Sequence, residues 1–270
     1  MSNFFINNEI EKIKEHRPLI HCITNYVTAN DCANIVLALG GIPTMANLVD
    51  EVSEITPKAD ALVINIGTLS KDSAESMIIA GKAANKNNVP VVFDPVGAAA
   101  SEARKKSALK ILSEVKVSVV KGNIAEIKAI LGMDSICKGV DSLEELSEEE
   151  AKEVVKEAAL RIGAVVAITG KRDYISDGEK VYIVSNGHKI LTRVTGTGCM
   201  TTSLIATYLG TTKDELTSTV LGIASMGIAG EIAYKNLKDR EGSGTLRVKI
   251  IDEIYNMTSE DLKERGKINE

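Results

Sequence analysis

The sequence predicts an α/β fold built on a mainly parallel, doubly wound sheet with helices on both faces. Short β-branched runs alternate along the chain with longer stretches of helical periodicity. Parallel strands joined through a helix need crossover connections, and these are nearly always right-handed. Two dipeptides, Asp177-Gly178 and Asn186-Gly187, favour tight turns between antiparallel strands. They predict an antiparallel hairpin edge around residues 173–194.

Four apolar runs predict the central strands. Each is short, rich in β-branched residues and nearly uninterrupted, as is typical of strands buried on both faces. In chain order they are residues 61–66, 89–93, 115–120 and 164–168. A fifth run, residues 180–185, lies between the two turn dipeptides and predicts a strand at the edge of the sheet.

Four further stretches predict helices. Residues 72–84 begin with Asp and Ser, which can cap a helix, and continue with an apolar stripe. Residues 147–160 carry acidic side chains in the first turn, which suits the helix dipole. Residues 200–208 follow a glycine-containing loop, and residues 213–234 are rich in small side chains that allow close packing.

The bulk properties predict one soluble domain spanning residues 1–270. Hydrophobic residues make up 44% of the chain and charged residues 26%, which is ordinary for a globular protein. The net charge of −5 gives no electrostatic support to a nucleic-acid partner. The most apolar segment, about residues 220–230, is too short to cross a membrane. Because the N-terminus also lacks the order of a signal peptide, we expect a cytoplasmic protein.

Cysteine and histidine residues show no spacing typical of a zinc site. We therefore expect reduced thiols, with Cys22 and Cys32 as packing residues. His21 is predicted to be a structural histidine, and His188 a surface or edge-strand residue. The full set is Cys22, Cys32, Cys137, Cys199, His16, His21 and His188.

The segment Val194-Thr-Gly-Thr-Gly-Cys199 indicates an anion-binding loop at the start of a helix. Its two glycines allow a tight turn and a close approach of the backbone to a ligand. The N–H groups of the following helical turn have no intrahelical acceptor, and the helix dipole favours negative charge there. Taken alone, the same pattern also fits an ordinary corner between a strand and a helix.

Polar residues follow each of the four central strands. They are Asn65, Asp94, Lys121 with Asn123 and Glu126, and Thr169. Because the carboxyl ends of parallel strands meet at one edge of a sheet, we expect these side chains to converge beside the loop 195–199. Each of them taken singly could instead cap a helix or form a turn.

This set of residues suits phosphoryl transfer, which needs cations and N–H donors at the phosphates and oxygen ligands for Mg²⁺. Lys121 is predicted to bind phosphate, and the carboxylates of Asp94 and Glu126 to hold Mg²⁺, in part through water. Cys199 lies where a proton acceptor for the attacking hydroxyl is needed. The chain contains neither a Walker motif nor the protein-kinase signatures.

Six segments together resemble the hydroxyethylthiazole kinase family, thiamine-salvage enzymes of the ribokinase-like superfamily. They are residues 18–26, 61–69, 93–97, 121–126, 186–188 and 194–199. The resemblance implies a ribokinase-like fold and ATP-dependent phosphorylation of the alcohol of 4-methyl-5-(2-hydroxyethyl)thiazole. It further implies a homotrimer with the thiazole pockets at subunit interfaces.

The resemblance also implies roles for individual residues. Asn25, Met45 and Gly196 match the thiazole-binding positions, and Asp94 and Glu126 match the magnesium side. The nucleotide is expected at Lys121, Asn123, Thr169, Thr195 and Gly198. Cys199 occupies the position where most ribokinase-like enzymes have a catalytic Asp, so it is the predicted catalytic residue.

Three departures from the family pattern bear on nucleotide affinity. Lys121 stands where many members have Arg, which keeps the charge but loses a bidentate phosphate contact. Ala99 replaces a glycine in the run that follows Asp94, and residues 242–246 differ from the late glycine motif of the family. We expect these changes to weaken nucleotide binding slightly and to leave the reaction type unchanged.

Three other functions stay open at this point. Another ribokinase-like kinase, such as one for hydroxymethylpyrimidine, would phosphorylate a different alcohol. A nucleotide-dependent hydrate dehydratase could use the same fold, and a sensor would bind ligand without turnover. Fold alone does not choose among them.

Overall fold

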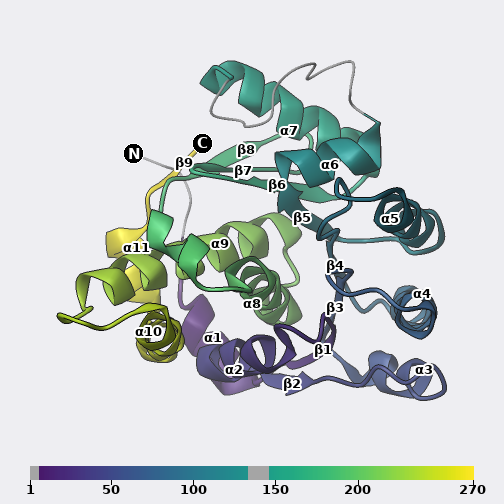
Figure 1. Ribbon diagram of the computed structural model, residues 1–270, viewed down its shortest axis with the longest axis horizontal. Coiled ribbons are helices and arrows are strands. Elements are labelled where there is room, and N and C mark those ends of the chain that lie inside the picture. Colours follow the sequence, from purple (N-terminus) through teal and green to yellow (C-terminus); the bar gives the residue numbers. More distant parts are fainter. Residues whose placement is uncertain (1–5, 133–145) are drawn as a thin grey trace.

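The computed structural model describes residues 6–132 and 146–270, so Cys137 lies outside the described residues. Within those ranges the strands form one nine-stranded sheet in the order β2-β1-β3-β4-β5-β6-β7-β8-β9 (Figure 1). Their bounds are β1 Leu19–Ile23, β2 Ile42–Thr44, β3 Ala61–Asn65, β4 Val91–Asp94, β5 Val119–Asn123, β6 Val165–Thr169, β7 Asp173–Ser176, β8 Val181–Val184 and β9 Ile268–Asn269.

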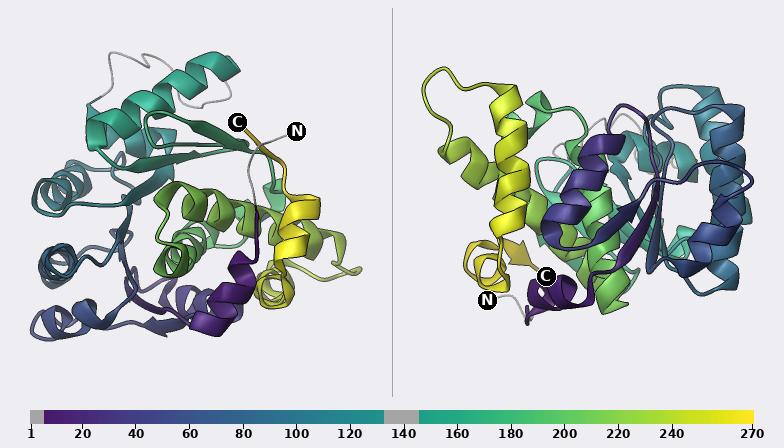
Figure 2. Two further views of the ribbon diagram at one scale, coloured as in Figure 1. Left: turned by 180° about the vertical axis from the view of Figure 1, so that it is seen from behind. Right: turned by 90° about the horizontal axis from the view of Figure 1, so that it is seen from below.

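Helices cover both faces of this sheet (Figures 1 and 2). Helices α1, α2, α8, α9 and α10 pack on one face, and α4, α5, α6 and α7 pack on the other. The bounds are α1 Glu9–His16, α2 Ala29–Leu39, α3 Val52–Ile55, η1 Thr56–Lys58, α4 Lys71–Lys86, α5 Glu102–Glu114, α6 Ile124–Leu131, α7 Glu148–Ile162, η4 Lys189–Arg193, α8 Thr197–Thr212, α9 Glu215–Lys235, α10 Ser243–Asn256 and α11 Ser259–Arg265.

The predicted fold class is confirmed. All strand pairs from β2 to β6 are parallel, and the pairs from β6 to β9 are antiparallel. The Asp177-Gly178 turn joins β7 to β8 in a hairpin, as predicted. The prediction for Asn186-Gly187 was wrong, because the chain continues from there into the 3₁₀ helix η4 and β8 pairs instead with β9.

Tertiary contacts override the predicted hairpin turn at Asn186-Gly187. The Asn186 side chain donates to the carbonyl of Arg265 (3.0 Å) and accepts from the N–H of Lys267 (2.7 Å). The N–H of Gly187 donates to Glu231 Oε1 (2.8 Å). These bonds fix the chain to the C-terminal segment and to α9 (Glu215–Lys235), so it does not fold back along β8.

The predicted strand 115–120 begins too early, because β5 starts at Val119. Val115 ends α5, its N–H bonds to the carbonyl of Ile111 (2.8 Å), and its side chain packs on α4. A Cβ added to Gly81 of α4 would lie only 2.5 Å from the side chain of Val115. The β-branched residue at this position therefore fills a helix–helix contact, which a strand pattern in the sequence cannot reveal.

Alternation along the strands builds two hydrophobic cores. Val63 and Val92 face α8 and belong to the larger core, whereas Leu62, Ile64 and Phe93 face α4 and α5. Successive side chains of a strand point to opposite faces, so a sheet covered on both sides needs apolar residues at every position. The polar ends of these strands are consequently the first positions free to carry chemistry.

Helix α9 (Glu215–Lys235) corrects the estimate that the apolar segment near residues 220–230 is short. With 21 residues, the helix is long and apolar enough to cross a membrane. However, 78% of its most apolar window is buried inside the structure. Its small residues allow contact with α8, and a Cβ on Gly222 would lie 2.6 Å from the side chain of Ile205. We therefore assign α9 as a core helix.

Candidate active site

The loop before α8 turns at Gly196, which is the N-cap of the helix and has φ +84°. A side chain there would collide with Thr28, because an added Cβ would lie 2.4 Å from Thr28 Cγ2. The first intrahelical bond runs from the N–H of Met200 to the carbonyl of Gly196 (2.8 Å). The N–H groups of Thr197, Gly198 and Cys199 precede that bond, so this helix end can receive an anion.

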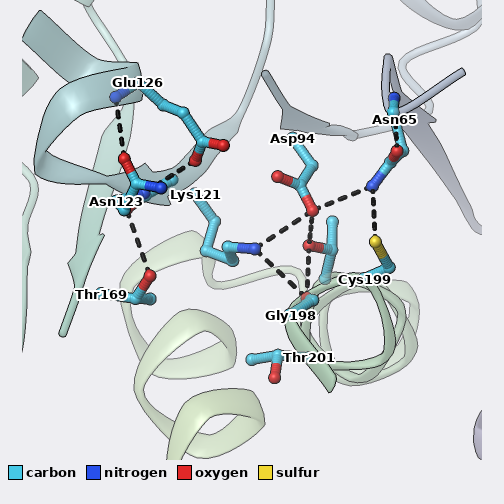
Figure 3. Close-up of polar contacts among 12 residues, drawn as sticks. Asn65, Asp94, Lys121, Asn123, Glu126, Thr169, Gly198, Cys199 and Thr201 are labelled. Carbon is cyan, nitrogen blue, oxygen red and sulfur yellow. Dashed lines mark hydrogen bonds and ion pairs between the residues drawn. The ribbon is translucent and has the colours of Figure 1, made fainter. Parts of the chain in front are cut away.

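Asp94 ends β4 and is fully buried. Its Oδ2 accepts hydrogen bonds from Asn65 Nδ2 (3.0 Å), Lys121 Nζ (3.1 Å) and Thr202 Oγ1 (2.7 Å) (Figure 3). Its Oδ1 is buried and has no hydrogen-bond partner among the described residues. A buried carboxylate oxygen without a partner is costly, so Oδ1 is available for a ligand or ion.

Lys121, on β5, is the cation of this site and is 5% exposed. Besides the bond to Asp94, its Nζ donates to the carbonyl of Gly198 (3.2 Å). Burial by itself would lower the pKa of Lys121, but the charges of Asp94, Cys199 and Glu126 raise it above its ordinary value. Lys121 therefore stays protonated and holds the end of β4 beside the first turn of α8.

Glu126 and Asn123 form a capping box at the start of α6. Asn123 Oδ1 accepts from the N–H of Glu126 (2.9 Å), and Glu126 Oε2 accepts from the N–H of Asn123 (2.9 Å). Glu126 Oε1 also accepts from the N–H of Gly97 (2.8 Å). Burial raises the pKa of Glu126 above its usual range, the two N–H bonds oppose that shift, and nearby Asp94 adds to it. Asp94 and Glu126 thus lie within electrostatic reach of each other.

Cys199 lies in the first turn of α8, and two amide groups point at its sulfur. Asn25 Nδ2 and Asn65 Nδ2 each lie 3.3 Å from Cys199 Sγ. Asn25 is itself bonded through Oδ1 to the N–H of Thr28 (3.1 Å). The sulfur is therefore an acceptor held between the ends of β1 and β3.

Asn25, Asn65, Asp94, Lys121, Glu126 and Cys199 form one polar cluster. Two cavities lie beside it. The larger, of about 770 Å³, is lined by Lys121, Thr169, Thr197, Gly198 and other residues. The smaller, of about 500 Å³, is lined by Thr24 and Tyr26, the neighbours of Asn25, and by Met45, Cys22, Ala29, Asn47, Thr68, Leu69, Ser70, Ser73 and Arg104. Cys199 follows Gly198, which lines the larger cavity, and its sulfur accepts from Asn25, whose chain neighbours Thr24 and Tyr26 line the smaller one.

The sequence model of the hydroxyethylthiazole kinase family matches residues 10–260 of the chain. The chain belongs to the hydroxyethylthiazole kinase family. The resemblance found in the sequence is thereby confirmed, and so is the enzyme class, a kinase that transfers a phosphoryl group to an alcohol.

Individual members of this family match the chain nearly end to end. The hydroxyethylthiazole kinase of Clostridium tetani (strain Massachusetts / E88) is 50% identical over 266 residues, covering 97% of each chain. That of Clostridium botulinum (strain Eklund 17B / Type B) is 49% identical over 262 residues, covering 96% of this chain and 94% of the relative. The solved hydroxyethylthiazole kinase protein of Pyrococcus horikoshii OT3 has a TM-score of 0.87 at 40% identity, covering 97% and 96%.

The residues predicted from the hydroxyethylthiazole kinase pattern fall into two groups. Most lie at the cluster or its cavities: Asn25, Met45, Asp94, Lys121, Glu126, Thr169, Gly196, Gly198 and Cys199. Thr195 is exposed in the turn before Gly196, and the Asn123 side chain serves as a helix cap. Neither of these two side chains lines the cavities described above.

Three residues in the site region were missed or only partly foreseen in the sequence. Asn65 was expected at the strand ends but without a role, whereas Thr202 and Asp173 were not singled out. Thr202 is one of several threonines along α8, and only the rotation of the helix shows that it reaches Asp94. Asp173 lies four residues after the predicted strand end at Thr169, and that proximity is the signal that could have found it.

The remaining cysteines and histidines behave largely as predicted. His21 is fully buried, with Nδ1 bonded to Thr56 Oγ1 (2.9 Å) and Nε2 to the carbonyl of Ala46 (2.8 Å). Cys22 and Cys32 are buried, and burial raises the pKa of Cys32 to about 11. His188 differs from expectation, because it stacks on Tyr234 (3.9 Å between ring centroids) and lines the larger cavity.

Asp173 makes the stability of the fold depend on pH. Burial raises its pKa to about 7, against the lowering effects of the Gly170 N–H bond (3.0 Å) and of Lys121. The ordinary value is 3.8, so between about pH 4 and pH 7 the folded state binds a proton that the unfolded chain has released. Stability therefore falls as pH rises through this range.

We expect Asp173→Asn to remove that pH dependence, since the amide cannot ionise and its oxygen still accepts from Gly170. At pH 8 the free energy of unfolding of the variant should exceed that of the wild type by up to about 4 kcal/mol, so the variant should unfold at a higher temperature. At pH 4 the two proteins should unfold alike. Thermal unfolding at both pH values checks this, and an equal difference at both would contradict it.

Proposed function

We propose that the chain phosphorylates the hydroxyl of 4-methyl-5-(2-hydroxyethyl)thiazole with ATP, as a step of thiamine salvage, within a single domain of residues 1–270. One observation carries this proposal: the buried Lys121–Asp94 pair and Cys199 meet at the first turn of α8, where Lys121 and Gly198 line the larger cavity and the chain neighbours of Asn25, which bonds Cys199, line the smaller one. A phosphoryl donor and an alcohol acceptor need two adjoining sites of this kind. The family membership supports the same chemistry.

The larger cavity suits the nucleotide. Lys121 supplies a positive charge for phosphate oxygens, and the first-turn N–H groups of α8 supply donors for the transferred phosphoryl group. Thr169 and Gly198 line the same cavity and are the proposed nucleotide contacts. The roles suggested for Asn123 and Thr195 stay predictions.

The smaller cavity suits the thiazole alcohol. Met45 gives it an apolar wall, and Asn25, which lies in the chain between the lining residues Thr24 and Tyr26, donates to Cys199 Sγ. Gly196, which packs on Thr28, would bring the backbone close to the ring.

Tyr26 lines this cavity although its side chain is 82% exposed, and Val27 beside it is 55% exposed. Exposed apolar groups at a ligand site favour a subunit interface, so we propose that the pockets lie between subunits. That these subunits form a homotrimer is what the resemblance to the family implies.

Mg²⁺ fits the acidic side of the site. Asp94 Oδ1 is buried without a partner, and Glu126 carries a second carboxylate within electrostatic reach. The described residues contain no cluster of three or more His, Cys, Asp and Glu side chains suited to a metal. Phosphate oxygens and water would therefore complete the coordination, as is usual for Mg²⁺. When bound, the ion would neutralise charge on the phosphates.

We propose a cytoplasmic enzyme.

The residues of the chain act mainly by positioning. The transition state of phosphoryl transfer is loose, so a strong base is not needed at the alcohol. Cys199 would orient the hydroxyl and accept its proton as the new O–P bond forms, while the bond from the γ-phosphorus of ATP to its bridging oxygen breaks and ADP leaves. Lys121 and the α8 amides would hold the phosphoryl group in line with that hydroxyl.

A coupled assay tests the proposed function. We expect ATP consumption with the thiazole alcohol in the presence of Mg²⁺, and a loss of most activity when the ion is chelated. Hydroxymethylpyrimidine should give a much lower rate, and no ATP should be consumed without an alcohol. Equal rates with both alcohols would point to a broader kinase, and tight binding without product would contradict the proposal.

A further inference from the structure

Asn65 connects groups from three parts of the site. It is the last residue of β3 and is fully buried. Its Oδ1 accepts from the N–H of Gly67 (2.9 Å) and from Asn25 Nδ2 (3.1 Å). These two donors fix which side of the amide carries the oxygen, since a flipped amide would face donors with its own NH₂ group.

The NH₂ group of Asn65 therefore points toward the chemistry. It donates to Asp94 Oδ2 (3.0 Å) and to Cys199 Sγ (3.3 Å) (Figure 3). An amide nitrogen has two hydrogens, and here each has its own acceptor. One planar group thus holds the carboxylate on the phosphate side and the sulfur on the alcohol side.

We propose that Asn65 is a positioning residue for phosphoryl transfer, which fixes Cys199 Sγ relative to Asp94 Oδ2. The inference rests on the roles proposed above for these two residues. Phosphoryl transfer depends on the alignment of the alcohol and the phosphoryl group, so loosening the link should lower turnover more than binding. The N–H bond should also stabilise negative charge that develops on the sulfur.

Thr202 provides a matched control. Its hydroxyl donates to the same oxygen, Asp94 Oδ2 (2.7 Å), and the carbonyl of Gly198 is a second, more distant acceptor (3.2 Å) for that one hydrogen. It lies one helical turn beyond Cys199, and its hydrogen bonds within residues 6–132 and 146–270 do not involve the sulfur. Thr202→Val therefore removes one donor from Asp94 at nearly constant size, while the amide at Cys199 stays in place.

The experiment compares Asn65→Leu and Thr202→Val with the wild type in the full chain. It measures kcat, KM for the thiazole alcohol, and the rate at which iodoacetamide alkylates Cys199 at one fixed pH without substrates. Peptide mass spectrometry assigns the alkylated residue. For Asn65→Leu we expect kcat to fall about 10-fold or more, KM to change less than about threefold, and alkylation to slow about fivefold. For Thr202→Val, alkylation should stay within about twofold.

Two results would overturn the inference. One is an Asn65→Leu variant whose kcat and alkylation rate both stay within about twofold of the wild type. The other is a Thr202→Val variant whose Cys199 is alkylated as slowly as in Asn65→Leu, which would mean general loosening of the pocket. If Asn65→Leu does not fold, Asn65→Asp replaces it, because it keeps the size and the oxygen that accepts from Gly67. If the wild type lacks kinase activity, the proposed function fails, and the alkylation comparison still decides the role of Asn65.

Discussion

Cys199→Ala is expected to lower kcat by roughly 10- to 1000-fold. This is at or below the low end of the about 10²- to 10⁴-fold that general acid–base groups typically contribute, because the loose transition state makes little demand on a base. The alanine removes the acceptor proposed for the hydroxyl of the substrate and leaves the Asn25 and Asn65 amides without the sulfur they bond. Steady-state kinetics with saturating ATP measure the effect. KM for the alcohol should change much less than kcat.

Cys199→Asp is the informative companion variant. The two amide NH₂ groups that now bond sulfur can donate to a carboxylate, so the variant should stay active or gain rate. Cys32→Ala is the control, because it removes a buried thiol that bonds Thr28 (3.8 Å) outside the reacting groups. Its kcat should stay within about twofold of the wild type. Unchanged turnover in Cys199→Ala would refute the catalytic role.

Lys121→Met is expected to cost about 3 to 5 kcal/mol of stability and most of the activity. The substitution leaves the fully buried Asp94 carboxylate without its cation, and it removes the charge proposed to bind phosphate. For a chain of this size the loss corresponds to a drop of roughly 10 °C in melting temperature. Thermal unfolding and a kinase assay at a temperature where the variant is folded separate the two effects.

Lys82→Met is the matched control for this prediction. Lys82 also forms an ion pair, with Glu114, but its side chain is 55% exposed. Surface pairs contribute at most about 1 kcal/mol, so this variant should melt within a few degrees of the wild type with full activity. Lys121→Arg keeps the charge and should retain far more activity than Lys121→Met. Equal melting of the Lys121 and Lys82 variants would show that the buried pair adds nothing.

The central sheet could be predicted from the sequence because its strands are buried on both faces. That burial requires continuous apolar runs, which are visible at residues 61–64 and 165–168. Strand β1 was not predicted, since it is short and contains His21, whose polarity is satisfied only by Thr56 and Ala46 from elsewhere in the chain. Such long-range partners leave no local pattern.

The convergence of the site residues was also predictable, because the carboxyl ends of parallel strands meet at one edge of a sheet. Asn65 and Asp94 are register partners on neighbouring parallel strands, as are Asn123 and Thr169. The sequence could not show that Asn123 turns to cap α6, or that Thr202 reaches Asp94 across the helix–sheet interface. Strand order follows from general rules of chain connection, whereas these contacts depend on rotamers and on the rotation of α8.

Helix α8 carries the anion-binding turn and also runs through the middle of the larger core, where residues 200–210 are buried. Segments that open independently have few buried contacts, and this one has many. Its amides should exchange with deuterium only through global unfolding, in contrast to those of a mobile lid. Heat should therefore abolish phosphoryl transfer and tertiary structure in a single transition.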